Sequence, residues 1–315
     1  MKDVAIPFIA ANGYAQTSAW VHALQQAMPD KRIISFNEMD NESKANCSVA
    51  IVANPNPADL QDLPRLQWVH SVWAGVERLV ADIGNKHVKI VRLVDPQLAV
   101  TMAEAVLAWT MYLHRDMPAY ARQQALRQWK SLDYVRPGNK TVGLLGLGAL
   151  GEAAATRLLD AGFNVCGWSR ATKNIPGVEH FSGETSLKAM LEKADILICL
   201  LPLTPETNGL LNAENLACLP DGASLINFSR GPIINDSDLR SALDSGRLKH
   251  AVLDVFEIEP LPINQWHWTH PGITVLPHCS APTDRETASA IVARNIQRYT
   301  DEGVIPVCVD MSRGY

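Results

Sequence analysis

The sequence predicts an α/β protein with two domains, each built on a parallel β-sheet. Short apolar runs alternate with helical patterns along the chain, which is typical of parallel strands joined by crossover helices. A long apolar stretch without glycine, residues 101–117, interrupts this alternation and predicts a buried helix that links the two domains. A chain of 315 residues with 47% hydrophobic content is long enough to bury two cores.

The first domain is predicted from five apolar runs and one helical pattern. The runs are rich in Ile and Val, as expected for strands buried in a parallel sheet. They occupy residues 5–10, 32–36, 48–54, 66–72 and 88–94, and the helical pattern occupies residues 20–28. We interpret residues 1–16 as a strand and its loop, because Asp3 and Pro7 interrupt what would otherwise imitate a signal peptide.

A polar helix is expected over residues 119–130, and a second alternation begins at residue 141 and predicts the other sheet. The expected strands occupy residues 141–148, 164–170, 195–202, 222–231, 250–256 and 273–278. The expected helices occupy residues 149–162, 186–194, 236–248 and 283–303. Gly162 stands where the first of these helices would end, which is the usual position of a C-terminal glycine.

Composition and charge exclude several classes of partner. Charged residues make up 19% of the chain and the net charge is −5, without a basic block, so a nucleic-acid partner is not expected. No apolar run approaches the ~18 residues that a membrane span needs, so we expect no membrane partner. The six cysteines are scattered without a CxxC pair, which indicates free thiols in a reducing compartment and predicts a cytoplasmic location.

The stretch Gly-Leu-Gly-Ala-Leu-Gly, residues 146–151, fits the GxGxxG pattern of dinucleotide-binding turns. Gly146 permits the tight turn, Gly148 lets the backbone approach a pyrophosphate, and Gly151 lets the helix pack closely on the strand. The pattern alone is weak, because glycine turns also close strands for steric reasons. Here an apolar strand precedes it and an Ala-rich helix follows, which favours a Rossmann-like nucleotide site at the start of that helix.

The end of the next strand predicts which nucleotide binds. NAD sites usually carry an Asp or Glu about 20 residues after the glycine turn, where it binds the ribose hydroxyls. This chain instead has Ser169 and Arg170, with Lys173 close behind. A hydroxyl, a guanidinium and an ammonium suit a 2′-phosphate, whereas a carboxylate would repel it. The stretch therefore favours NADP, with NADPH preferred over NADH, and a solvated loop arginine is the alternative reading.

Three further strand ends carry residues that could perform chemistry. Arg230 lies in a Ser-Arg-Gly turn, which suits a planar carboxylate, and His278 follows a strand and a proline, where it could act as an acid or base. Glu259 follows another strand and could hold the imidazole in its protonated form. Each residue alone has a structural explanation, such as a surface salt bridge or a core histidine. Together, after the glycine turn, they predict an active site.

In series, these motifs resemble those of the D-isomer-specific 2-hydroxyacid dehydrogenases. The resemblance rests on the glycine turn and on the stretches LLPLTPETNGLL, NFSRGPIINDSDL, AVLDVFEIEPLP and VLPHCSAPT, and it is firmest over residues 141–282. Within the family, GWSRATKNIPGV and the C-terminal SRGY (residues 312–315) are most similar to the NADPH-dependent glyoxylate/hydroxypyruvate reductases.

The resemblance implies a role for each matching residue. Arg230 matches the arginine that binds the substrate carboxylate and carbonyl, His278 the proton donor, and Glu259 its carboxylate partner. Asp254 matches an acid near the nicotinamide carboxamide. Further cofactor contacts are implied at Ala149, Leu150, Leu201, Pro202, Thr207, Phe228, Ser229 and Ser280.

The stretch WAGVE, residues 73–77, matches a family loop whose backbone N–H groups hold the substrate carboxylate. The implied substrate-binding residues are Trp73, Ala74, Gly75 and Val76, besides Arg230. The family usually has glycine where this chain has Trp73, which either narrows the pocket or packs at the interface between the domains. 

The resemblance also implies a layout. The cofactor domain, residues 98–283, would be inserted into a discontinuous substrate domain, residues 1–97 and 284–315. A homodimer is expected, and Trp129 is similar in place to a tryptophan that some relatives insert into the partner's active site.

The predicted function is therefore NADPH-dependent reduction of a small 2-oxo acid, of the glyoxylate or hydroxypyruvate type, to the D-2-hydroxy acid. The alternatives are an NAD-dependent dehydrogenase of another 2-hydroxy acid and a non-enzymatic nucleotide-sensing regulator of the same fold. Formate dehydrogenases have Gln where this chain has Glu259, which argues against them. No metal is expected, because His267 and His270 lie in a proline-containing turn without a ligand cluster.

Overall fold

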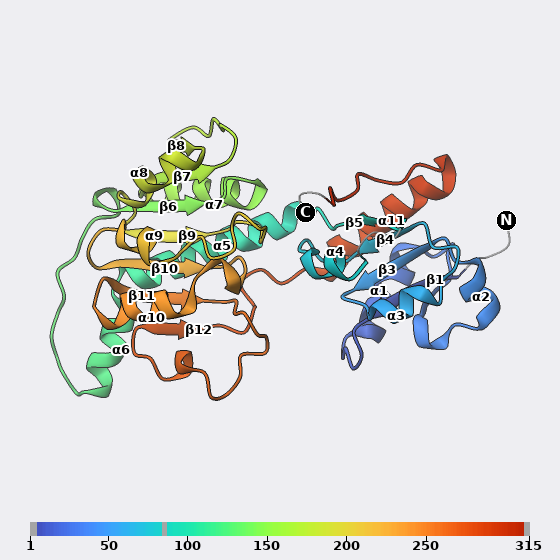
Figure 1. Ribbon diagram of the computed structural model, residues 1–315, viewed down its shortest axis with the longest axis horizontal. Helices are drawn as coiled ribbons and strands as arrows, with labels where there is room; N and C mark the ends of the chain where they lie inside the picture. Colours follow the sequence, from blue (N-terminus) through green and yellow to red (C-terminus); the bar gives the residue numbers. More distant parts are fainter. Residues whose placement is uncertain (1–4, 84–86, 312–315) are drawn as a thin grey trace. The chain divides into compact units, whose positions relative to one another are not determined.

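The computed structural model describes residues 5–83 and 87–311 (Figure 1). The C-terminal SRGY stretch, which contributed to the resemblance, lies outside the described residues, as do residues 1–4. The chain divides into two compact units. Unit 1 comprises Met1–Gln97 and Thr283–Tyr315, and unit 2 comprises Leu98–Pro282. The second segment of unit 1 begins at Thr283, and Asp284 caps its helix α11.

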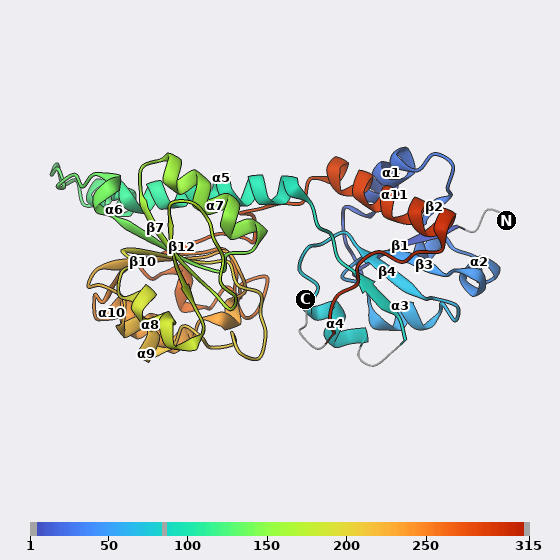
Figure 2. The same ribbon diagram turned by 90° about the horizontal axis from the view of Figure 1, so that it is seen from above.

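Unit 1 is a parallel sheet of five strands in the described residues, in the order β2-β1-β3-β4-β5. The strands are β1 (Ile6–Ala10), β2 (Ile33–Ser35), β3 (Val49–Ala53), β4 (Trp68–Ser71) and β5 (Lys89–Val91). The helices are α1 (Thr17–Ala27), α2 (Asn41–Asn46), α3 (Pro57–Gln61), α4 (Glu77–Ile83) and α11 (Arg285–Glu302), with a 3₁₀ turn η1 (Phe36–Glu38). Helices α1 and α11 cover one face of the sheet, and α3 and α4 cover the other (Figure 2).

Unit 2 is a second parallel sheet, with seven strands in the described residues and the order β12-β11-β10-β9-β6-β7-β8. The strands are β6 (Thr141–Leu145), β7 (Asn164–Ser169), β8 (Val178–Ser182), β9 (Ile196–Cys199), β10 (Ala223–Asn227), β11 (Leu248–Leu253) and β12 (Ile273–Val275). The α/β fold with parallel sheets is thus confirmed. The order reverses direction between β6 and β9, and ligands of open α/β sheets bind at such a switch point.

The helices of unit 2 cover both faces of its sheet. They are α5 (Pro96–His114), α6 (Met117–Ala125), α7 (Ala149–Asp160), α8 (Leu187–Leu191), α9 (Ala213–Ala217) and α10 (Asp236–Asp244), with 3₁₀ turns η2 (Pro137–Asn139), η3 (Glu184–Ser186), η4 (Gly231–Ile233) and η5 (Trp266–Trp268). One buried cluster joins α5 and α7 to the sheet, and another joins α8, α9 and α10 to its other face (Figure 2). The strands β6, β7, β9, β10 and β11 are largely buried, so they read as mainly apolar runs, whereas β8 is only partly buried.

The helices and the cysteines each bear on an expectation drawn from the composition. Among the described residues, no helix combines the length and the apolar character that crossing a membrane requires. All six cysteines are free. Cys47, Cys166 and Cys199 are buried, whereas Cys279 is exposed in the loop after β12.

Candidate active site

The predicted functional residues of unit 2 gather at the carboxyl ends of its parallel strands. They occupy residues 146–151 after β6, 169–173 at the end of β7, 201–207 after β9, 228–230 after β10, 254–259 after β11 and 278–280 after β12. Because the strands are parallel, their carboxyl ends meet at one edge of the sheet. Motifs that are separate in the sequence therefore lie along one edge of the sheet.

His278 and Glu259 form a direct side-chain pair at this edge. His278 Nδ1 lies 2.7 Å from Glu259 Oε2, and Glu259 Oε1 accepts a hydrogen bond from the Phe256 N–H at 2.9 Å. The hydrogen bond to Glu259 raises the pKa of His278 above its ordinary value, against the opposing effects of burial and of Arg230. Burial alone would raise the pKa of Glu259, but the hydrogen bonds from His278 and Phe256 outweigh it and lower that pKa. The pair therefore favours imidazolium beside carboxylate.

Arg230 is presented by a turn that the preceding strand holds. Its Nη1 donates to the Ser229 carbonyl at 2.7 Å, and its charge affects the pKa of both Glu259 and His278. The buried Asn227 side chain accepts from the Ser229 N–H and donates to the Arg230 carbonyl, both at 3.1 Å. Sequence reasoning missed Asn227, although a buried asparagine that ends an apolar strand is a signal for such a turn.

Asp254 holds the loop that carries His278. Both its carboxylate oxygens accept backbone hydrogen bonds, from Cys279 N–H at 2.7 Å and Ser280 N–H at 2.9 Å. The Asp254 carbonyl accepts from the His278 N–H at 3.0 Å. His278 itself has a φ of 51°, a left-handed conformation that costs free energy in a non-glycine residue. Asp254, which the sequence assigned to the cofactor, thus stabilises the loop that carries His278.

The glycine turn has the geometry that a pyrophosphate site requires. Gly146 has a φ of 103°, and a Cβ added at Gly151 would lie 1.9 Å from the Gly146 carbonyl oxygen, so the fold itself demands both glycines. Gly148 differs, because its φ is −74° and an added Cβ would meet no other described atom within 4 Å. Gly148 leaves open space at the amino terminus of α7, where backbone N–H groups can bind an anion.

The turn after β7 exposes two of the residues expected to bind a 2′-phosphate, whereas the hydroxyl of the third, Ser169, bonds within the protein. The side chains of Arg170 and Lys173 are exposed, as a phosphate site would need. Ser169 Oγ, however, donates to the Ala171 carbonyl at 2.7 Å and lies 3.0 Å from His180 Nε2. The single hydroxyl hydrogen of Ser169 is therefore already used within the turn. His180, on β8, was not predicted as part of this site.

The remaining expected cofactor residues divide into buried and exposed groups. Ala149 is exposed and Leu150 is partly buried at the start of α7. The side chains of Leu201, Thr207, Phe228 and Ser229 are buried, with Ser229 Oγ donating to the Leu201 carbonyl and Thr207 Oγ1 donating to that of Pro202. The hydroxyls of Thr207 and Ser229 stabilise turns, so these residues would contact a ligand mainly through their backbone groups. The buried Ser280 Oγ has no hydrogen-bond partner among the described residues, which leaves it available to a ligand.

The residues of the expected substrate loop belong to unit 1, where they connect β4 to α4. The Trp73 ring packs edge-on against Tyr14 and Trp20 of the same unit, at centroid distances of 6.3 and 5.9 Å. Its partly buried position is therefore explained by packing within unit 1. Within the described residues, the amides of Ala74, Gly75 and Val76 donate no hydrogen bond to another backbone group.

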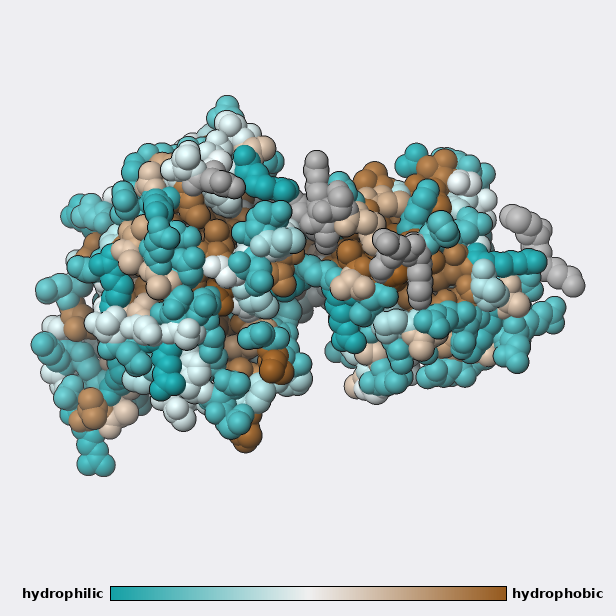
Figure 3. All heavy atoms as spheres, viewed as in Figure 1, coloured by the Kyte–Doolittle hydropathy of each residue, from teal (hydrophilic) through white to brown (hydrophobic). Residues whose placement is uncertain are grey.

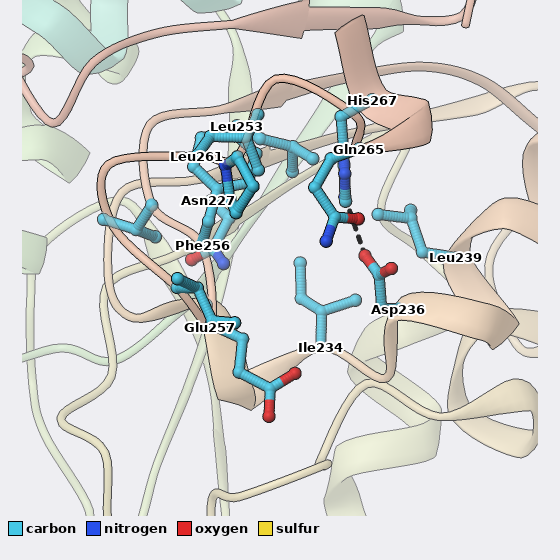
Figure 4. Close-up of a pocket in the computed structure, with 14 residues that line it drawn as sticks. Asn227, Ile234, Asp236, Leu239, Leu253, Phe256, Glu257, Leu261, Gln265 and His267 are labelled. Carbon is cyan, nitrogen blue, oxygen red and sulfur yellow. Dashed lines mark hydrogen bonds and ion pairs between the residues drawn. The ribbon is translucent and has the colours of Figure 1, made fainter.

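A cavity of about 80 Å³ lies beside the candidate site and does not include the catalytic candidates (Figure 4). Asp236 accepts hydrogen bonds there from His267 Nε2 at 2.7 Å and from Trp266 Nε1 at 2.8 Å. His270 pairs with Asp244 at 3.1 Å instead. The described residues contain no group of three or more His, Cys, Asp or Glu side chains that could hold a metal ion.

Comparison with known proteins identifies the class to which this fold and site belong. Residues 107–280, more than half of the chain, match the family model described as D-isomer specific 2-hydroxyacid dehydrogenase, NAD binding domain. The chain therefore belongs to the D-isomer specific 2-hydroxyacid dehydrogenases, as its motifs predicted.

Solved structures of this family resemble the chain over almost its whole length. A D-isomer specific 2-hydroxyacid dehydrogenase from Xanthobacter autotrophicus Py2, in complex with NADPH and MES, is 37% identical, with a TM-score of 0.90 over 99% of this chain and 100% of that one. An NADPH-dependent glyoxylate/hydroxypyruvate reductase from Sinorhizobium meliloti, in complex with NADP and sulfate, is 33% identical, with a TM-score of 0.90 over 98% and 100%. A probable 2-hydroxyacid dehydrogenase from Rhizobium etli CFN 42, in complex with NADP, HEPES and L(+)-tartaric acid, is 31% identical, with a TM-score of 0.87 over 99% of each chain.

Proposed function

We propose that this protein uses NADPH to reduce a small 2-oxo acid, of the glyoxylate or hydroxypyruvate type, to the D-2-hydroxy acid. The observation that carries the proposal is the 2.7 Å contact between His278 Nδ1 and Glu259 Oε2, at the same sheet edge as Arg230 and the glycine turn. A protonated histidine beside a guanidinium is suited to a substrate that has a carboxylate and develops negative charge on its carbonyl oxygen.

The chemistry of each residue follows from this geometry. NADPH, when bound, supplies the hydride that forms the new C–H bond at the keto carbon. His278 Nδ1 is occupied by Glu259, so Nε2 is the nitrogen that gives its proton to the carbonyl oxygen as that oxygen becomes a hydroxyl. Glu259 stabilises the imidazolium before the transfer. Arg230 binds the substrate carboxylate and polarises the carbonyl, which places a fixed positive charge where negative charge develops.

The choice of NADPH rests on the turn after β7 and on the relatives. Arg170 and Lys173 are exposed there, and the turn lacks the acid that an NAD site usually has. The three structural relatives described above were crystallised with NADP or NADPH. The open space at Gly148 and the unpartnered Ser280 hydroxyl fit a dinucleotide. We therefore assign the adenosine 2′-phosphate to Ser169, Arg170 and Lys173.

Two further assignments belong to the proposal. The backbone amides of residues 74–76 in unit 1 are assigned a carboxylate-binding role, which their lack of a backbone acceptor among the described residues supports. The protein acts as a cytoplasmic homodimer, which would cover Trp129, a side chain that is 104% exposed. On the face drawn in Figure 3, hydrophilic residues predominate, with hydrophobic residues among them. Sedimentation equilibrium tests the dimer, and a monomer at micromolar concentration would contradict it.

The experiment that tests the function measures loss of reduced nicotinamide absorbance with glyoxylate and with hydroxypyruvate. His278→Ala should lower kcat at least about 100-fold, the typical share of a general acid. His22→Ala, which removes an exposed histidine from α1, is the matched control and should retain full activity. NADPH binding, followed by nicotinamide fluorescence, should survive in His278→Ala. Binding of NADPH without turnover of any 2-oxo acid by the wild type would favour the nucleotide-sensing alternative.

A further inference from the structure

The hydrogen bonds of Ser169 determine how the neighbouring histidine must be protonated. A carbonyl oxygen cannot donate, so Ser169 Oγ is the donor in its 2.7 Å contact with the Ala171 carbonyl. That contact uses the only hydrogen of the hydroxyl. In the 3.0 Å contact between Ser169 Oγ and His180 Nε2, the histidine must therefore be the donor. His180 thus carries a hydrogen on Nε2 and directs it at Ser169.

The register of β7 and β8 explains why this contact forms. Gly167 is paired with His180, and Ser169 is paired with Ser182, so all these positions share one face of the sheet. The Leu147 side chain fills the space above Gly167, and the imidazole of His180 reaches the residue two positions further along β7. On the same face, Ser182 Oγ lies 3.3 Å from Thr172 Oγ1. Two side chains of β8 therefore hold the turn of residues 169–172.

We propose that His180 is a positioning residue for the adenosine 2′-phosphate and so helps determine the preference for NADPH. The inference rests on the proposed function and adds a residue to its cofactor site. His180 occupies a lone pair of Ser169 Oγ but cannot accept the hydroxyl hydrogen. Only the Ala171 carbonyl and a bound phosphate oxygen then compete for that hydrogen. An Nε2–H donor consequently keeps Ser169 in place and leaves its hydrogen for the phosphate.

The first test compares cofactors. His180→Ala should raise KM for NADPH about fivefold to tenfold, the effect of one lost hydrogen bond, and leave kcat unchanged. KM for NADH should not change, because NADH lacks the 2′-phosphate. His180→Gln retains an amide N–H donor near the position of Nε2 and should restore most of the NADPH affinity. Equal losses with NADPH and NADH would indicate a purely structural role and overturn the inference.

The second test asks whether His180 acts through Ser169, by a double-mutant cycle read out as binding. Calorimetric titration with adenosine 2′,5′-bisphosphate and with AMP isolates the 2′-phosphate without turnover. His180→Ala should weaken binding of the bisphosphate alone, and adding His180→Ala to Ser169→Ala should cause little further loss. Independent, additive losses would contradict the inference. A wild type that does not prefer the bisphosphate to AMP would instead contradict the assignment of NADPH.

Thermal unfolding of each variant separates these effects from loss of fold. Glu179→Gln is the control on the same strand, because Glu179 pairs with Lys193 rather than with the turn. This variant should keep the cofactor preference of the wild type. A matching loss of preference in Glu179→Gln would show that any change in β8 has this effect, and would overturn the role of His180.

Discussion

Replacing Glu259 with glutamine perturbs the proposed proton donor without changing the shape of its partner. A charge-assisted hydrogen bond contributes about 1.5–3 kcal/mol. The side chains of His278 and Glu259 are 52% and 35% exposed, so solvent screening places this pair at the lower end, about 1.5 kcal/mol. The imidazolium should therefore lose roughly a factor of ten in stabilisation when the carboxylate is replaced. We expect Glu259→Gln to lower the pKa of His278, because the neutral amide no longer stabilises the imidazolium.

The assay is the pH dependence of kcat/KM for reduction. His278 donates its proton, so reduction is fastest below the pKa of His278 and falls as pH rises through it. In Glu259→Gln this fall should begin at lower pH than in the wild type, with a smaller loss on the acidic plateau. The oxidation direction needs neutral His278, and its rate should rise with pH over the same range.

Glu257→Gln is the matched control, since Glu257 is exposed in the same loop and has no part in the pair. Its profile should follow the wild type. If Glu259→Gln kept the wild-type pH profile in both directions, the reasoning that Glu259 sustains the imidazolium would be refuted.

The other predictions concern the cofactor site and the loop of His278. Gly148→Ala should leave the melting temperature unchanged, because the new Cβ meets no described atom within 4 Å, and it should raise KM for NADPH. Gly151→Ala should lower the melting temperature, because its Cβ would clash with the Gly146 carbonyl oxygen. Equal melting temperatures in the two variants would contradict the different roles assigned to these glycines. Arg170→Ala should reduce the ratio of kcat/KM for NADPH to that for NADH about tenfold or more, from loss of a charge-assisted hydrogen bond, and an unchanged ratio would remove Arg170 from the 2′-phosphate site. Asp254→Asn retains one carboxamide oxygen for two backbone donors, so chemical denaturation should show a loss of about 1–3 kcal/mol, whereas wild-type stability would contradict the role of Asp254 in the loop.

The pair of His278 and Glu259 also links stability to pH. The pKa of folded His278 is raised, so its stabilising contribution is present at low pH and is lost as pH rises through that pKa. The pKa of folded Glu259 is lowered, so its contribution is present above its unfolded pKa and is lost as pH falls through the folded value. The pair should therefore stabilise the protein most between these two ranges, and the pH dependence of unfolding in His278→Ala checks this.

The sequence could predict the sheets because buried parallel strands are continuous apolar runs. It missed β8, whose residues Val178–Ser182 are only partly buried and include Glu179 and His180, so no apolar run marks this edge strand. The helix expected over residues 119–130 instead spans Met117–Ala125, and Arg127 beyond its end has a left-handed φ of 55°. Such local reversals leave no trace in hydrophobic periodicity.

The site was predictable to the extent that it follows strand ends. Arg230, Glu259 and His278 each stand after an apolar run, and parallel topology brings such positions to one edge. The contacts around them depend on register and backbone conformation. The donation of His180 to Ser169 requires the pairing of β7 with the unpredicted β8, and the role of Asp254 requires the left-handed conformation of His278. Neither can be read from residue spacing.

The most direct measurement is the initial rate of nicotinamide oxidation with glyoxylate and with hydroxypyruvate, run in parallel with NADPH and NADH. The proposed function predicts turnover with a strong preference for NADPH. It also predicts that His278→Ala loses most of this turnover with either cofactor. Turnover that favours NADH would retain a 2-oxo acid reductase but contradict the 2′-phosphate site at Ser169, Arg170 and Lys173. Absence of turnover with both cofactors and both acids would contradict the proposed function itself.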